Sequence, residues 1–135
     1  MHENLKNISR YTDGRGEIQM ILESCDVGSI SRIVTVPNSF RARHMHPTDT
    51  HYCEIITGEV EYYERKTGSG DKPSKNIFRD GDIIYTPNGY DHEMFFNLHT
   101  VMNCYSKLPR TTENYEKETI RFTESLKEIY DKWKE

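Results

Sequence analysis

Two stretches of this sequence decide the fold. Residues 38–58 read NSFRARHMHPTDTHYCEIITG, and residues 81–97 read GDIIYTPNGYDHEMFFN. Together they contain four of the six histidines of the chain. Neutral imidazole is a good ligand for divalent transition metals, so the clustering indicates a candidate metal site.

Strand geometry places these histidines on a common face. Residues two apart on a strand point to the same side, so His44 and His46 share a face. A turn through residues 47–50 would bring His51 back beside them on the next strand. A barrel interior lined by these strands could then direct several imidazoles toward one point.

Glu54 is a rival to His51 as a ligand from this strand. Alternation puts Cys53 and Ile55 on the face of His51 and turns Glu54 away. We therefore prefer His51.

Short apolar or alternating runs, bounded by turn residues, continue on both sides of the two stretches. Runs of this length, rich in Ile, Val, Tyr and Thr, predict an all-β antiparallel sandwich or barrel. The runs are residues 18–22, 29–36, 40–46, 51–56, 60–64, 77–78, 83–86, 93–97 and 101–105.

The last 25 residues change to helical spacing. We expect a barrel with an N-terminal arm over residues 1–110 and a helix over residues 111–135, packed on the barrel or on a partner subunit. The helix begins near Thr112, or only at Thr123 if residues 119–122 form a further strand. The apolar residues on one face are Tyr115, Phe122, Leu126, Ile129, Tyr130 and Trp133.

The two stretches resemble the paired motifs of the cupin superfamily, in its RmlC-like jelly-roll form. The first motif is built around His-x-His followed by a Glu and a Gly, and the second around Gly, Pro-x-Gly and a His. The resemblance covers roughly residues 29–105 and implies a double-stranded β-helix, the jelly-roll barrel. Asn38 replaces the first glycine of the motif.

The resemblance also implies a ligand set. Carried over by position, the family's metal ligands become His44, His46, His51 and His92, with His51 in place of the usual Glu. This is similar to small cupins that use four histidines for one divalent ion, such as Zn, Mn, Fe or Ni.

Such an ion would act as a Lewis acid that polarises a carbonyl and stabilises an enolate. The main functional hypothesis is therefore a metal-dependent isomerase, lyase or dioxygenase acting on a small polar, anionic or carbohydrate-derived metabolite. Tyr85 and Cys53 are candidate general bases, and Met94 and Phe96 are candidate pocket walls.

Two alternatives remain open. The stretch GRGEIQMILES (residues 14–24) and the chain length are similar to the metal-free cupins that isomerise or epimerise nucleotide-linked keto sugars. In that case Arg41 and Arg43 would pair with a pyrophosphate. The other alternative is a non-catalytic cupin that binds a small ligand.

Composition restricts the partners. A net charge of −4 gives no general attraction for nucleic acid or acidic membranes. No apolar run approaches the ~20 residues that span a bilayer, and residues 1–16 lack a signal-peptide core, so we expect a cytoplasmic protein.

Three cysteines without a CxxC pair argue against a disulfide framework. The arm and the apolar helix face predict a homodimer with a small-molecule ligand.

Overall fold

A computed structural model describes residues 10–22 and 26–134 of the chain, and most of them lie in antiparallel strands. Residues 1–9, which include part of the predicted arm, and Cys25 lie outside the described residues. No helix in the described ranges is long and apolar enough to cross a membrane.

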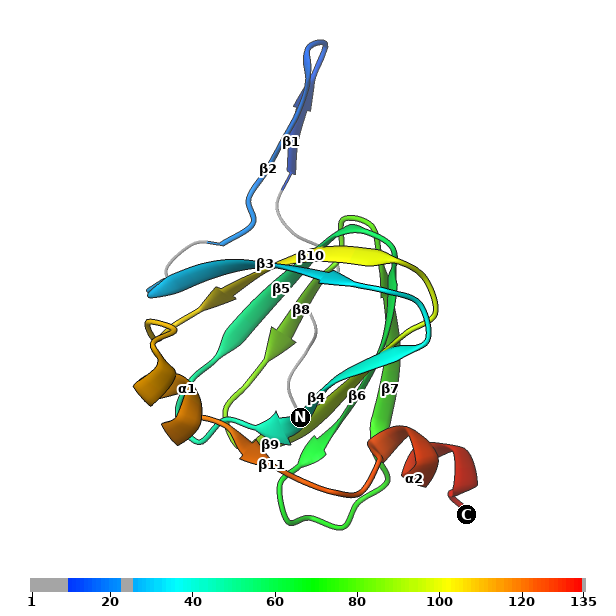
Figure 1. Ribbon diagram of the computed structural model, residues 1–135. Helices are drawn as coiled ribbons and strands as arrows, with labels where there is room; N and C mark the ends of the chain where they lie inside the picture. Colours follow the sequence, from blue (N-terminus) through cyan, green and yellow to red (C-terminus); the bar gives the residue numbers. More distant parts are fainter. Residues whose placement is uncertain (1–9, 23–25, 135) are drawn as a thin grey trace.

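Two sheets face each other and form the barrel (Figure 1). One has the strand order β3-β10-β5-β8 and the other β11-β4-β9-β6-β7. This arrangement confirms the predicted all-β jelly roll, and each predicted run from residue 29 to 105 overlaps a strand. The strands are β3 Ser29–Thr35, β4 Ser39–Met45, β5 His51–Thr57, β6 Glu59–Lys66, β7 Ser74–Arg79, β8 Ile83–Thr86, β9 Tyr90–Phe96, β10 Thr100–Ser106 and β11 Ile120–Arg121.

The hydrophobic core lies between the sheets, where alternate residues of facing strands meet. Tyr62 and Phe78 pack edge to face with their ring centroids 6.0 Å apart. As predicted, Cys53 and Ile55 point inward and are buried. The core cluster consists of Cys53, Ile55, Val60, Tyr62, Phe78, Ile84, Met94, Phe96, Met102 and Cys104.

Strand β4 contains a bulge. Its pairing with β9 is regular up to Ala42, which opposes Glu93, and then shifts so that His44 opposes His92. Ala42 and Arg43 have φ angles of 72° and 59°, a left-handed conformation that is rare for residues other than glycine. The extra residue changes the alternation, so Arg41 lines the barrel cavity with His44 while Arg43 turns outward.

The C-terminal segment is not one helix. It forms α1 Thr112–Lys117, the short strand β11 and α2 Leu126–Lys132. The prediction of a continuous helix over residues 111–135 is therefore wrong, whereas the alternative with a strand in residues 119–122 is confirmed. Pairing of β11 with the edge of β4 removes these residues from the helix. Trp133, which was placed on the apolar helix face, lies at the C-terminal cap and is 39% exposed.

A buried carboxylate anchors α2 to the barrel. Glu93 is fully buried, and its carboxylate accepts hydrogen bonds from the Ser125 hydroxyl (2.8 Å) and the Lys127 backbone N–H (3.0 Å). The Arg43 guanidinium lies 2.8 Å from the other carboxylate oxygen. Leu126 completes the contact with 1% of its surface exposed.

The described part of the N-terminal arm is a hairpin. Strands β1 Arg10–Asp13 and β2 Gly16–Gln19 pair with each other and project away from the barrel (Figure 1). Tyr11 and Ile18 are direct cross-strand partners and are both more than half exposed. The hairpin thus carries apolar side chains that its own barrel does not cover.

Replacing Glu93 with Ala should lower the free energy of unfolding by about 2–4 kcal/mol, because the substitution leaves three buried or half-buried donors without an acceptor. Urea unfolding followed by circular dichroism measures this loss. Glu113→Ala is the matched control: Glu113 pairs with Lys117 on the surface of α1, and its loss should change stability by less than about 0.5 kcal/mol. Equal stability of the two variants would contradict the anchoring role of Glu93.

Candidate functional site

The predicted histidines line a cavity of about 260 Å³ inside the barrel. The barrel wall of this cavity carries His44, His46, His51 and His92, together with Arg41 and Met94. The other wall comes from the C-terminal segment and carries Arg110, Tyr115 and Arg121. These last three residues lie outside both histidine motifs and were not predicted as site residues.

Three histidines form a compact cluster. Ligand nitrogens of His44, His46 and His92 all lie within 4.8 Å of one another. The cross-strand pairing of His44 with His92 brings their ring centroids to 4.8 Å, and His46 lies 4.6 Å from His44. Among the described residues, these three form the one group able to hold a metal ion.

The orientation of His46 is fixed from the C-terminal segment. Its Nδ1 contacts the backbone carbonyl of Glu118, and because a carbonyl only accepts, Nδ1 carries the proton. Nε2 is buried and has no hydrogen-bond partner among the described residues. Burial, and then the nearby charge of His51, lowers the pKa of His46. The ring is therefore neutral at neutral pH, with a lone pair on a nitrogen that lacks a partner.

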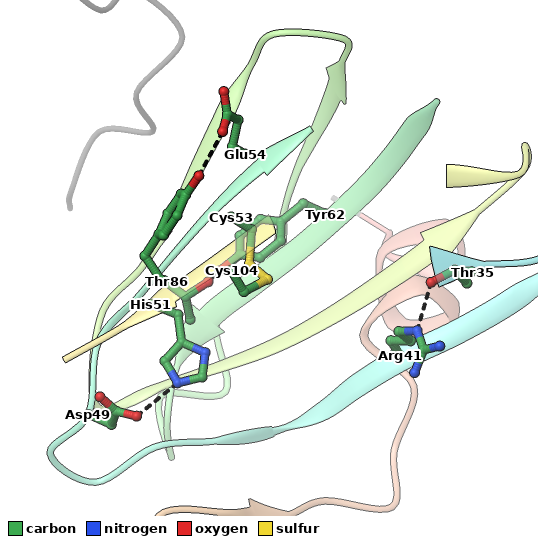
Figure 2. Close-up of a disulfide and its surroundings, with 10 residues drawn as sticks. Thr35, Arg41, Asp49, His51, Cys53, Glu54, Tyr62, Thr86 and Cys104 are labelled. Atoms are coloured by element: carbon green, nitrogen blue, oxygen red, sulfur yellow. Dashed lines mark hydrogen bonds and ion pairs between the residues drawn. A yellow bond between two sulfur atoms is a disulfide. The ribbon is translucent and has the colours of Figure 1, made fainter. Parts of the chain in front are cut away.

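His51 has a different environment from the other three histidines. Its ring stacks on His46 at a centroid distance of 4.3 Å, but its Nε2 lies 2.9 Å from Oδ2 of Asp49 (Figure 2). Partial burial alone would raise the pKa of Asp49, but hydrogen bonds from His51 and from the backbone N–H groups of Leu108 and Thr50 hold it below its usual value. His51 and Asp49 therefore form an oriented imidazole–carboxylate pair, and the predicted four-histidine metal set stays a prediction.

The electrostatic environment keeps the cluster uncharged. Burial, followed by the repulsion that a protonated ring would meet from His46, His51, Arg121 and Arg110, lowers the pKa of His44 to about 3. Burial likewise places the pKa of His92 well below the usual histidine value. Neutral imidazoles are the form that binds metals and accepts protons.

A buried carboxylate behind His92 was missed by the sequence analysis. Glu64 is the cross-strand partner of His92 and is 6% exposed. Its carboxylate accepts a hydrogen bond from the Tyr62 hydroxyl (2.7 Å), which also contacts Thr86 (2.9 Å). Burial raises the pKa of Glu64 to about 7. No motif marks Glu64, because its position depends on the pairing of β6 with β9.

The two described cysteines are joined. Cys53 and Cys104 are directly opposed on β5 and β10, with Cα atoms 4.2 Å apart, and form a disulfide (Figure 2). The expectation that the cysteines are unpaired is therefore wrong for these two, because an odd total says nothing about a single cross-strand pair. In the bridged form Cys53 has no thiol, so it does not serve as the predicted base.

Tyr85 is not a cavity residue. It alternates along β8 with the buried Ile84 and Thr86 and packs on Tyr52, its cross-strand partner, at a centroid distance of 4.9 Å. Its predicted role as a base is therefore wrong.

Glu54 likewise faces out of the barrel, where it accepts a hydrogen bond from Tyr105 (Figure 2). This orientation removes Glu54 as a rival ligand.

The predicted substrate residues are divided between the site and the framework. Arg41 and Met94 line the cavity, and Arg41 also donates hydrogen bonds to Thr35 and to the Val34 carbonyl. Arg43 instead pairs with Glu93 on the outer side of the sheet. Phe96 belongs to the core and does not line the cavity. The predictions for Arg43 and Phe96 are wrong because the bulge and the depth of the core are not visible in strand alternation.

A second glutamate, Glu118, holds the C-terminal wall in place. Its carboxylate accepts hydrogen bonds from the backbone N–H groups of Thr48 (2.8 Å) and Asp49 (2.7 Å) and from the Thr48 hydroxyl. These bonds connect the β4–β5 loop to the segment after α1. The loop that carries the Asp49–His51 pair is therefore fixed by the same residue that orients His46.

Comparisons with known proteins identify the fold. No protein-family model matches the chain, and no curated protein is similar to it in sequence. Among solved structures, it superposes on a double mutant of the QdtA 3,4-ketoisomerase from Thermoanaerobacterium thermosaccharolyticum in complex with TDP, with a TM-score of 0.71 and 20% identity over 97% of this chain and 94% of that one. A 3,4-ketoisomerase from Helicobacter canadensis gives 0.70 and 17% identity over 94% and 93% of the two chains.

A third match is to part of a longer protein. The capsular polysaccharide assembling protein CapF from Staphylococcus aureus matches with a TM-score of 0.63 and 16% identity over 85% of this chain. This chain spans about a third of CapF, 34% of its length. At these identities the matches establish the architecture. The chain has the jelly-roll fold of these structures, with a C-terminal helix added.

Proposed function

We propose that this chain isomerises or epimerises a keto sugar linked to a nucleoside diphosphate. The observation that carries the proposal is the His51–Asp49 pair, which lies in a cavity that also holds arginines. The two ketoisomerases of the same fold, one of them in complex with TDP, support this class of substrate over the metal-dependent main hypothesis.

The pair provides a general base. Donation from His51 Nε2–H to the Asp49 carboxylate leaves the lone pair of the neutral ring on Nδ1. Asp49 fixes this tautomer and stabilises the imidazolium that forms when Nδ1 takes a proton. The ring stacks on His46, so the base lies beside the histidine cluster.

The proposed reaction balances within the sugar. His51 takes the proton from the carbon next to the ketone, and the electron pair of the broken C–H bond forms an enediolate with its charge on the carbonyl oxygen. Returning the proton to the former carbonyl carbon, while the hydroxyl proton moves to the other oxygen, shifts the ketone by one position. Returning the proton to the opposite face of the same carbon inverts that centre.

A divalent transition metal also fits this site, and we propose His44, His46 and His92 as its ligands. The supporting observation is Nε2 of His46, a buried nitrogen with a lone pair and no described partner, beside two other neutral imidazoles. When bound, the ion would polarise the carbonyl oxygen of the substrate. His51 remains the fourth ligand predicted from the sequence, although its Nε2 faces Asp49.

We further propose that the chain is a homodimer, with the cytoplasm as its expected location. The outer face of the β3-β10-β5-β8 sheet exposes Ile30, Val34 and Ile56, and the projecting hairpin exposes Tyr11 and Ile18. Two uncovered apolar surfaces on one small chain are typical of an interface between copies. A two-fold axis would lay the hairpin of each copy on the sheet of the other.

The enzyme proposal predicts exchange of a carbon-bound proton with solvent. In D2O, a thymidine-diphosphate-linked 4-keto sugar should gain deuterium next to the ketone, which proton NMR follows. His51→Asn should slow the exchange by about 10²–10⁴-fold because the base is lost, and Asp49→Asn should slow it by reversing the tautomer. His99→Asn, on the exposed turn between β9 and β10, should leave it unchanged. Tight binding without any exchange would favour the non-catalytic alternative.

The metal proposal predicts about one ion per chain after incubation with Zn, Mn, Fe or Ni, measured by elemental analysis. His46→Ala should abolish binding, because Nε2 is the nitrogen without another partner. Glu54→Gln should retain the ion, since Glu54 faces Tyr105. His51→Ala decides the ligand number: retention means three histidines, and loss restores the set of four. Full occupancy in His46→Ala would exclude the proposed cluster.

Light scattering should give twice the 16.0 kDa of one chain if the homodimer forms. Ile18→Asp should shift the protein toward the monomer, because an aspartate on the hairpin would have to lose its hydration in the interface. Leu98→Asp provides the control, since Leu98 is 53% exposed on the turn between β9 and β10, outside both surfaces. A monomeric wild type at micromolar concentration would refute the dimer.

A further inference from the structure

The C-terminal wall of the cavity carries an arginine pair with an aromatic ring between its members. The Arg110 guanidinium carbon lies 5.1 Å from the centroid of the Tyr115 ring, and that of Arg121 lies 5.9 Å from the same ring. All three side chains line the cavity. They come from the loop before α1, from α1 and from β11, so the short turn of helix folds two sequence-distant arginines onto one ring.

The described carboxylates do not neutralise this pair. Among residues 10–22 and 26–134, no ion pair involves Arg110 or Arg121. The two acidic residues on the cavity wall have other partners, since Asp49 pairs with His51 and Glu118 accepts hydrogen bonds from Thr48 and Asp49. Two guanidinium groups at one wall, without a counter-charge among the described residues, form a site for an anion.

Arg110 and Arg121 lie close to the histidine cluster inside the barrel. Arg121 is the cross-strand partner of His44, and both arginines line the cavity that holds the histidine cluster. An anion bound between them would therefore lie at the open side of the cavity, next to the position of a substrate held at His51. This is the position required for the diphosphate of a nucleotide-linked sugar whose keto group faces the histidines.

The C-terminal segment that carries Arg110, Tyr115 and Arg121 is already fixed to the barrel before a ligand binds. Glu118 joins it to the β4–β5 loop, β11 pairs with β4, and the Phe122 backbone N–H donates to the Arg43 carbonyl. The Tyr115 ring restricts the two guanidinium groups through cation–π contacts. Because the wall is already ordered, binding costs little conformational entropy.

We propose that Arg110 and Arg121 bind the diphosphate group of the ligand, with Tyr115 as the residue that positions them. The identity of the ligand rests on the proposed function. Guanidinium groups match phosphate oxygens with paired hydrogen bonds, which a lysine would not reproduce. Substrate selection then depends on a segment that lies outside both histidine motifs.

The test is calorimetric titration of the metal-free protein with TDP, so that phosphate–metal contacts do not contribute. Arg110→Gln and Arg121→Gln should each raise the Kd for TDP about tenfold, the loss expected for one charge-assisted contact. Arg79→Gln is the control, because Arg79 lies on β7, pairs with Glu59 on the surface and does not line the cavity, and its Kd should equal that of the wild type. Circular dichroism and the melting temperature confirm that each variant is folded.

Two further measurements test whether the arginines bind a diphosphate and whether this site and the isomerase proposal stand separately. Inorganic pyrophosphate should displace TDP at lower concentration than inorganic phosphate does, and equal displacement would overturn the diphosphate assignment in favour of a simple phosphate site. Unchanged TDP affinity in both arginine variants, or a wild type that does not bind TDP, would overturn it as well. If the variants lose TDP but the wild type shows no deuterium exchange, the arginine site stands and the isomerase proposal falls.

Discussion

The bulge in β4 is the constraint on which the remaining structure depends. Two consecutive residues other than glycine, Ala42 and Arg43, adopt left-handed backbone angles, a conformation that costs about 1–2 kcal/mol per residue. Without the extra residue, His44 would not share a face with Arg41 and would not oppose His92. The same irregularity turns Arg43 outward to Glu93, which anchors α2. One local distortion therefore sets both the interior of the barrel and the attachment of its C-terminal helix.

The site is assembled from two parts of the chain that are far apart in sequence. The barrel provides the histidines, and the segment from Leu108 to Arg121 provides the opposite wall with its arginines and Tyr115. Glu118 joins the two, since its backbone carbonyl orients His46 while its carboxylate holds the loop of Asp49. The jelly roll provides a rigid barrel, and the chemistry of its cavity depends on the C-terminal segment that forms the opposite wall.

Much of the barrel could be predicted from the sequence, because strand alternation is local. The shared face of His44 and His46, and that of Cys53 and Ile55, follow from their period of two, and the opposite facing of Glu54 follows equally. The failures have non-local causes. Tyr85 was predicted as a base although alternation alone did not show which way its side chain points. Arg43 was predicted to face the cavity because the bulge in β4 is visible only in the cross-strand register. The disulfide, Glu64 and the C-terminal arginines depend on which strands become neighbours, and a single sequence does not state this.

The contact between His46 Nδ1 and the Glu118 carbonyl has a practical consequence. It makes the tautomer of an interior imidazole dependent on whether the C-terminal tail is seated on the barrel. Release of the tail would free the ring to exchange its proton between the two nitrogens. Nitrogen-15 chemical shifts of this one ring would therefore report tail docking in solution, so that a spectroscopic label inside the barrel could monitor a movement at its surface.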